Sequence, residues 1–227
     1  MIKLEMTDVF GWESAIRGMR NPMNSWDKID SRWDGFGDAD GFSIGANDLS
    51  LMKKLSKAGN DHAKFLRMIN VTVDITAPLY WWKEYDTYKV GTVANSCSTM
   101  HKIHAKGFSL DDFSHEKLTY ASENVLGFVI VRLNECRDKF IETNDKLWWE
   151  QMIQLLPTSY NQKRTVQLNY AVLKNMYFSR RNHKLDEWRT LCEWMLELPY
   201  FKEIVVEPNT ATNKRTYDSD GEAGIND

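Results

Sequence analysis

A long helical pattern between Ser114 and Thr143 is the feature that most constrains the fold of this chain. An α-helix has about 3.6 residues per turn, so residues three or four positions apart lie on one face. The apolar residues at this spacing are Leu118, Val125, Val129, Leu133, Cys136 and Phe140. The pattern predicts a long helix over 114–143 and a fold in which helices dominate.

Shorter patterns predict the other elements. Strands are expected at 3–10 and 70–75, the latter because Val71, Val73 and Ile75 alternate with polar residues. Helices are expected at 12–20, from an Asn47 cap to Gly59, at 146–156, at 162–183 and at 188–198, with a long loop from Asn21 to Gly45. The expected fold class is α+β and helix-dominated, with a small antiparallel sheet packed with long helices. Residues 1–206 would form a single domain and residues 207–227 a disordered polar tail.

The charge balance and the cysteines limit the classes of partner and the compartment. The 227 residues carry a net charge of −3 and the pI is near 6.0, which does not favour nucleic acid or anionic lipid. The three cysteines are far apart, which argues against disulfides and for a reducing compartment. No stretch approaches the length of a membrane span, and the first residues lack the apolar core of a signal peptide. A cytoplasmic protein is expected.

A line of polar side chains occurs in the expected helix that ends near His183. At helical spacing, Asn169, Met176, Arg180, His183 and Glu187 form one stripe, and apolar residues surround the other sides. Such a helix is mostly buried, and buried polar groups need hydrogen-bonding partners. Two explanations remain open. A bound ligand supplies the partners, or the stripe is a structural network in which Arg180 pairs with a carboxylate such as that of Glu187.

Other candidate sites have simple structural explanations beside the functional ones. Cys97, His101 and His104 have a spacing compatible with zinc, but a structural zinc site needs a fourth ligand, so no metal is expected. The segment that contains them, "ANSCSTMHKIH", is either a turn that holds a phosphate or an ordinary loop. The Trp pairs at 81–82 and 148–149 could stack planar ligands, although a core or a subunit interface is the more common role.

Three segments together resemble one enzyme family. "SAIRGMR" places Arg17 and Arg20 three apart near the end of a helix, and "LSLMKKLSKAGNDHAKFL" precedes a strand and "AP". The strongest segment is "LLPTSYNQKRTVQLNYAVLKNMYFSRRNHKLDEW", with a Leu-Pro, a Tyr, two asparagines six apart, an arginine five further on, then His and Trp. Over roughly residues 8 to 200, the chain resembles the flavin-dependent thymidylate synthases, which use reduced FAD and methylenetetrahydrofolate to methylate dUMP.

The resemblance implies roles for residues of the strongest segment. Asn169 and Asn175 match the two asparagines that contact flavin. Arg180 matches the arginine that faces the pyrimidine and the flavin, and His183 matches a nearby histidine, with one residue fewer between them here. An amide and a guanidinium supply directed donors of the kind that hold an isoalloxazine edge or a uracil. The resemblance thus explains the polar stripe by a bound cofactor.

The first two segments imply further contacts to the cofactor. Arg17 and Arg20 match the family's two arginines that precede a phosphate-contacting turn. His62 matches a flavin-contacting histidine if the "AP" after the strand is the anchor, whereas Asn60 takes that place if Gly59 is the anchor. Both alternatives remain open.

The family's signature, Arg-His-Arg followed by seven residues and a Ser, is altered in this chain. "YDTYKVGTVANSCSTM" stands in its place. Ser98 matches the signature serine, Asn95 matches an asparagine before it, and Lys89 is the only cation left at the signature positions. Met100 and Ile153 occupy the places of two further family arginines, and neither side chain can donate to a phosphate as an arginine does.

The resemblance implies a divergent relative that binds FAD and a pyrimidine nucleotide or related substrate across subunit interfaces of a homotetramer. A one-carbon unit or a hydride would be transferred, and a protein partner is possible. The implied catalytic residues are Arg180 and Ser98, the cofactor-binding residues are Asn169, Asn175, His183, His62 and Arg20, and the substrate-binding residues are Lys89, Asn95, Ser98 and Arg180. The alternative is a catalytically inactive homologue that acts as a nucleotide-binding or protein-binding regulatory protein.

Overall fold

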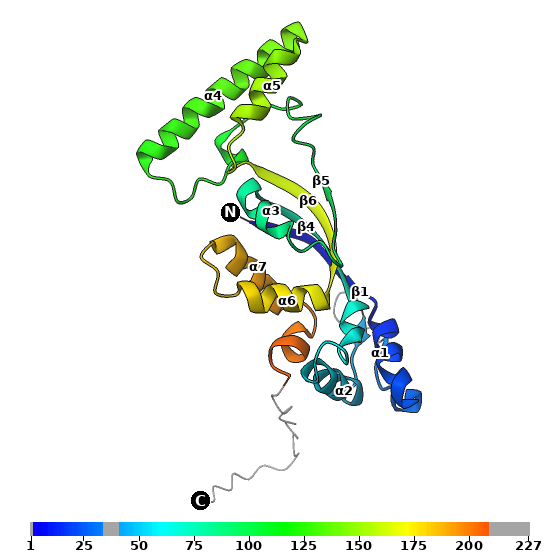
Figure 1. Ribbon diagram of the computed structural model, residues 1–227. Coiled ribbons are helices and arrows are strands. Elements are labelled where there is room, and N and C mark those ends of the chain that lie inside the picture. Colours follow the sequence, from blue (N-terminus) through cyan, green and yellow to red (C-terminus); the bar gives the residue numbers. More distant parts are fainter. Residues whose placement is uncertain (1, 34–40, 209–227) are drawn as a thin grey trace, which may run out of the picture.

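An antiparallel sheet lies at the centre of the fold. The computed structural model describes residues 2–33 and 41–208. The strands are β1 (Lys3–Phe10), β4 (Asn70–Pro78), β5 (Val93–Ser96) and β6 (Asn161–Asn169), in the order β1-β4-β6-β5 (Figure 1). Val71, Val73 and Ile75 of β4 are buried, and the residues between them are half-buried, so the core lies on one face of the sheet. The strands predicted at 3–10 and 70–75 are confirmed.

Three helices pack against the buried face of the sheet: α3 (Leu79–Tyr85), α6 (Tyr170–Arg180) and α7 (Asp186–Glu197) (Figure 1). Their shared core is aromatic. The ring of Trp81 has its centroid 4.9 Å from that of Trp82 and 4.9 Å from that of Trp188. Edge-to-face and tilted ring pairs of this kind add to the free energy of burial. The 81–82 Trp pair therefore belongs to the core, the more common of its two expected roles.

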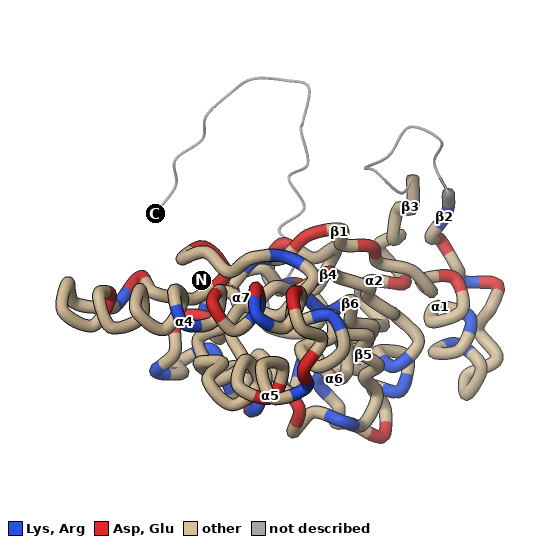
Figure 2. The backbone as a smooth tube through the Cα atoms, turned by 90° about the horizontal axis from the view of Figure 1, so that it is seen from above, with Lys and Arg blue, Asp and Glu red and all other residues tan. Residues whose placement is uncertain are grey.

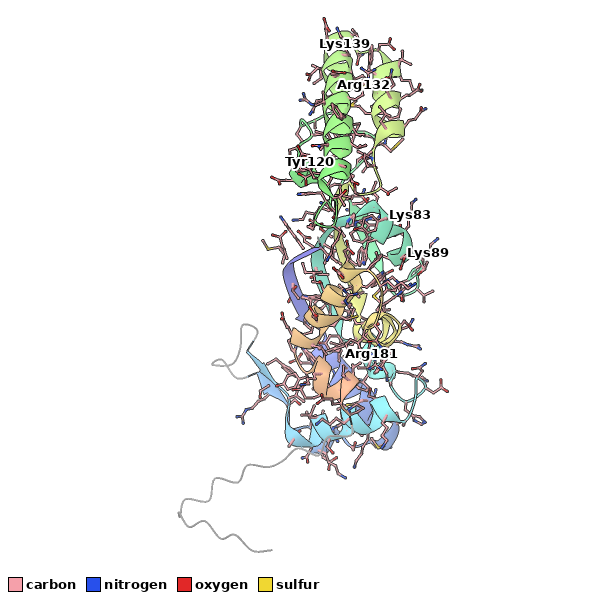
Figure 3. The ribbon with its side chains drawn as sticks, turned by 90° about the vertical axis from the view of Figure 1, so that its left-hand side faces the viewer. Lys83, Lys89, Tyr120, Arg132, Lys139 and Arg181 are labelled. Atoms are coloured by element: carbon pink, nitrogen blue, oxygen red, sulfur yellow. The ribbon has the colours of Figure 1, made fainter. Side chains whose placement is uncertain are left out.

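A helical hairpin extends away from the sheet. Its helices are α4 (Tyr120–Thr143) and α5 (Lys146–Leu155), seen at the top of Figures 1 and 3. They have a hydrophobic cluster of their own, which includes Leu126, Ile130, Leu133, Cys136 and Met152. The predicted long helix is confirmed, but it begins at Tyr120 and not at Ser114. The Thr119 side chain caps it by accepting the N–H of Ser122 at 3.4 Å.

The remaining long helices are α1 (Trp12–Arg20) and α2 (Ala46–Lys57), at the bottom of Figure 1. Both helices were predicted, but Asn47 is not the cap of α2. The helix begins at Ala46, and the carboxylate of Asp30 accepts the N–H groups of Asn47 at 2.8 Å and of Asp48 at 3.0 Å. The cap comes from a distant part of the chain, so the local sequence does not reveal it.

The helix predicted at 162–183 is wrong in its first part. Residues Asn161–Asn169 form β6, which pairs along its length with β4 and over residues 164–167 with β5. These neighbours satisfy its backbone groups on both sides, which overrides a weak local preference for helix. The helix α6 starts only after Asn169, so Asn169 is its cap and not part of a helical stripe.

The other elements are short. A two-stranded sheet of β2 (Arg32–Trp33) and β3 (Phe42–Ser43) lies within the predicted loop. Short helical turns pack against α6 and α2. The 3₁₀ turns are Asn21–Met23, Trp26–Lys28, Lys64–Arg67 and Leu110–Asp112, and a π-helical turn spans Lys202–Val206. The tail predicted at 207–227 lies outside the described residues from position 209 onward. Among the described helices, none has the length and hydrophobicity to cross a membrane.

Candidate functional site

A cavity of about 850 Å³ opens at the start of α6 and is called the α6 cavity below. It lies between α6, the segment that follows α2 and the loop that follows α3. A volume of this size is typical of sites for small ligands and cofactors. Its lining is Asn60, Ala63, Leu66, Arg67, Thr87, Tyr88, Lys89, Val90, Gly91, Asn169, Ala171, Val172, Lys174, Asn175 and Phe178.

The junction between β6 and α6 forms one wall of the α6 cavity. The Asn169 side-chain oxygen accepts the N–H groups of Ala171 and Val172, each at 3.1 Å, and so begins the helix. Gly91 has a φ of +79°, and a Cβ there would lie 3.0 Å from a Val172 methyl carbon and 3.2 Å from the Asn169 amide nitrogen. A glycine at this position therefore lets the loop approach the start of the helix closely.

Lys174 lies on the α6 wall of the cavity and links this helix to α2. Its Nζ donates to the Ser56 carbonyl oxygen at 2.9 Å and to the Ser56 hydroxyl at 3.3 Å. Burial lowers the pKa of its ammonium group from the ordinary value. Ser56 is in the last turn of α2, where carbonyl groups lack partners within the helix, so the lysine also stabilises that end of α2.

Beside the cavity, a polar cluster gathers around one carboxylate oxygen of Glu84. Arg180 donates to it at 2.9 Å, Trp188 Nε1 donates at 3.0 Å, and His183 Nε2 lies 3.3 Å away. Arg180 Nε also donates to the Tyr88 hydroxyl at 2.9 Å, and its guanidinium lies 4.7 Å from the Trp188 ring centroid. The name Glu84 cluster is used below for Glu84, Tyr88, Arg180, His183 and Trp188. Its Tyr88 also lines the α6 cavity.

The carboxylate that pairs with Arg180 is thus Glu84 and not Glu187. Glu187 instead accepts a short hydrogen bond from the Tyr80 hydroxyl. Burial and the neighbouring Glu187 carboxylate raise the pKa of Tyr80 well above its ordinary value. A carboxylate therefore pairs with Arg180, as the network explanation predicts, but it comes from α3 and not from Glu187.

The structure brings some of the predicted site residues together. Asn169, Asn175 and Lys89 line the α6 cavity, and Lys89 projects from the loop after α3 (Figure 3). Arg180 adjoins the cavity through Tyr88, and His183 lies beside Arg180 at their shared partner Glu84. These predicted residues come from two parts of the chain, the loop after α3 and the segment 169–183, which the fold places side by side.

Other predicted residues lie elsewhere. Asn95 is exposed on β5 opposite Thr165, and the exposed Ser98 accepts the N–H groups of Met100 at 3.2 Å and His101 at 2.8 Å. Neither Asn95 nor Ser98 lines the α6 cavity. Of the two alternatives near Gly59, Asn60 lines the cavity and the exposed His62 does not.

Arg20 is engaged within the fold. It is 3% exposed, and its Nε and one terminal nitrogen each lie 2.7 Å from one oxygen of Asp48. Among the described residues, no group of three or more His, Cys, Asp or Glu side chains could hold a metal ion.

Among the residues that sequence reasoning missed are three that line the α6 cavity and one that adjoins it. Arg67, Lys174 and Phe178 line it, and Glu84 organises the adjoining cluster. A signal for two of them existed: with a helix that starts after Asn169, positions 171, 174, 175 and 178 fall on one face. The incorrect helix start hid this face. No local pattern pointed to Arg67 or Glu84.

Comparison with known proteins identifies the fold. No protein-family model matches the chain, and no curated protein matches it. The structure is similar to the flavin-dependent thymidylate synthase ThyX from Helicobacter pylori complexed with FAD and dUMP, with a TM-score of 0.64, 16% identity, and coverage of 89% of this chain and 97% of that one. A second structure of ThyX from Helicobacter pylori with FAD and dUMP gives a TM-score of 0.65, 15% identity, and coverage of 92% and 99%. The predicted fold class is confirmed: this chain has the fold of the flavin-dependent thymidylate synthases, in a divergent form.

Proposed function

We propose that this protein binds FAD and a pyrimidine nucleotide or a related substrate, with the FAD in the α6 cavity. The observation that carries the proposal is that the cavity gathers Asn169, Asn175 and Lys89 in a fold whose solved relatives hold FAD and dUMP. Lys89 comes from the loop after α3, whereas Asn169 caps α6 and Asn175 lies within it, so the fold brings two separate parts of the chain to one cavity.

The lining of the cavity fits a flavin nucleotide. Tyr88 and Phe178 offer aromatic rings, and Val172 and Leu66 offer apolar surface for a planar group. The side chains of Asn60, Asn169 and Asn175 offer amide donors and acceptors for its polar edge. Reduced FAD, when bound, would supply a hydride or relay a one-carbon unit.

Arg180 would orient the pyrimidine or the flavin. Glu84 and Tyr88 each accept one of its N–H groups, which fixes the plane of the guanidinium. An arginine has five N–H donors, so donors remain for a ligand after these two contacts. The chain therefore provides, beside the cavity, a guanidinium whose orientation is already fixed before a ligand binds.

A direct experiment tests the proposal. The purified protein is incubated with FAD and separated from free FAD by gel filtration, and its visible absorption spectrum is recorded. We expect about one flavin retained per subunit. A colourless protein that holds no FAD even from an excess would refute the proposal.

A second candidate function, a catalytically inactive nucleotide-binding or protein-binding regulatory protein, is favoured by one observation. Met100 and Ile153 stand where the family has arginines, so the usual phosphate donors are absent from those places. An activity assay separates the two functions: the flavin-loaded protein is incubated with dUMP, methylenetetrahydrofolate and a reductant. Methylated product supports the enzyme, whereas stable binding of flavin and dUMP without product supports the regulatory protein.

We also propose that the protein is a homo-oligomer, a tetramer as the resemblance implies. Asn95 and Ser98 are exposed and lie outside the α6 cavity of their own chain, so they are available to a second copy. The α4 helix carries exposed apolar side chains for such a contact: Tyr120, Val125, Phe128 and Val131 are 83%, 63%, 76% and 57% exposed. An apolar face of this extent on one helix is typical of an interaction surface.

Replacing Phe128 with Asp should weaken this association. A carboxylate in the centre of an apolar interface loses its water without gaining a partner, so we expect at least about a tenfold rise in the dissociation constant. Sedimentation velocity over a range of protein concentrations measures the change. Met6→Asp, at an apolar residue of β1 that is 81% exposed, is the control. Equal sedimentation of F128D and the unaltered protein would place the interface elsewhere.

A further inference from the structure

All the charged side chains that line the α6 cavity are positive. Its lining contains three cationic side chains, Arg67, Lys89 and Lys174, and no carboxylate. The chain as a whole is acidic, with a net charge of −3, and acidic and basic residues are interspersed along it (Figure 2). The cationic lining is therefore a local feature and does not follow from the composition.

None of these three cations has a carboxylate partner within the described residues. Arg67 and Lys89 make no hydrogen bond or ion pair there, and both side chains are exposed at the cavity wall. Lys174 donates only to Ser56, which accounts for two of its three N–H groups. Like charges around one cavity repel one another, and the repulsion is strongest where water is excluded. A bound anion would offset this cost.

The anion would be held by side chains and not by the start of α6. The Asn169 side chain already accepts the N–H groups of Ala171 and Val172. Helix N-termini bind phosphate through free N–H groups of this kind. Because they are occupied here, the three cations are the main donors available to an anion in the cavity.

We propose that Arg67, Lys89 and Lys174 form a phosphate-binding subsite for the phosphorylated part of a nucleotide ligand. The subsite rests on the proposed function for the assignment of that ligand. Phosphate oxygens accept charge-assisted hydrogen bonds, which Arg and Lys supply. The phosphate could belong to FAD or to the pyrimidine nucleotide, and the ligand pairs below distinguish these sources.

Binding of matched ligand pairs tests the subsite. Isothermal titration calorimetry measures the dissociation constants of FAD and riboflavin, and of dUMP and deoxyuridine, for the unaltered protein and for the R67Q and K174M variants. We expect the unaltered protein to prefer the phosphorylated member of one pair. Each variant should reduce that preference by about tenfold, the typical effect of one lost charge-assisted hydrogen bond. Increasing salt should reduce it as well.

Lys117→Gln is the matched control. Lys117 lies at a second cavity of about 760 Å³, which none of the predicted site residues line, and its side chain is 84% exposed. K117Q removes one positive charge from the chain, as R67Q and K174M do, so it should leave the preference unchanged. Because Met keeps the aliphatic stem of Lys174 and Arg67 is exposed, both variants should fold, which circular dichroism verifies.

The outcomes separate this proposal from the assignment of the flavin. If FAD binds but R67Q and K174M keep the full preference for the phosphorylated ligand, the subsite is refuted and the flavin assignment stands. If no flavin binds but ADP, as a pyrophosphate probe, binds and weakens in both variants, the subsite stands and the flavin assignment fails. Failure of the unaltered protein to bind any of the phosphorylated ligands would refute the subsite.

Discussion

Replacing Asp48 with Ala is expected to lower the free energy of unfolding by about 3–5 kcal/mol, the usual cost of breaking a buried ion pair by removing one partner. Asp48 is 0% exposed and its partner Arg20 is 3% exposed. One oxygen of Asp48 faces Arg20 at 2.7 Å. The other accepts the Ser31 hydroxyl at 2.7 Å and the N–H groups of Asp30 and Ser31 at 3.0 Å. The substitution would leave the Arg20 charge buried without a carboxylate.

Urea unfolding of the variant and the unaltered protein measures this loss. Glu142→Ala is the control, because Glu142 pairs with Lys139 at 2.8 Å on the exposed side of α4, with side chains 66% and 53% exposed. An exposed pair contributes about 0–1 kcal/mol, so the control should unfold nearly as the unaltered protein does. A loss of less than about 1 kcal/mol for D48A would contradict the buried pair.

The same site makes stability depend on pH. Burial alone raises the pKa of Asp48, but the hydrogen bonds from Ser31, Arg20 and the backbone outweigh it and hold the pKa below the ordinary value of 3.8. The folded state therefore binds this proton less tightly than the unfolded state. The stabilisation is fully present above about pH 4 and is lost as the pH falls through the folded-state pKa. D48A should lose less stability than the unaltered protein over that acidic range.

Elements with strong local patterns could be predicted from the sequence. The strand at 70–75 shows an alternation of period two, and the helix α4 shows the 3.6-residue period over most of its length. In the strand, the residues that give the pattern are also those that pack in the core. In α4, this holds for Val129, Leu133, Cys136 and Phe140, whereas Val125 is exposed. The Asp48 site shows the opposite case. Its partners are 17, 18 and 28 residues away, so nothing near Asp48 in the sequence indicates an ion pair.

The candidate site was only partly predictable for the same physical reason. β6 obtains its conformation from β4 and β5, and this pairing places the start of α6 at Asn169 and not before it. The start of the helix decides which side chains face the cavity. Asn175 was found through a resemblance, whereas Lys174 beside it was missed, because the cavity is formed by segments that are distant in sequence.

Replacing Glu84 with Ala is expected to lower the free energy of unfolding by about 2 kcal/mol. Arg180, His183 and Trp188 all contact one oxygen of Glu84, so the substitution removes a shared partner from three side chains. The Glu84 side chain is 36% exposed, and water would replace part of the lost interactions, which keeps the effect below that of D48A. Glu193→Ala, at an exposed position of α7, is the control and should leave stability nearly unchanged.

Ligand binding by Glu84 variants shows whether the cluster serves the site or only the fold. If Glu84 positions Arg180, E84A should weaken FAD or dUMP binding by about tenfold even where the protein remains folded. E84Q keeps a side-chain oxygen that accepts from Arg180 and Trp188 but removes the charge, so it should recover most of the stability and part of the binding. A purely structural role predicts that E84A, studied well below its melting temperature, binds both ligands as the unaltered protein does. Both variants keep Arg180. Weaker ligand binding by E84A than by E84Q would therefore show that Glu84 must hold the guanidinium in position.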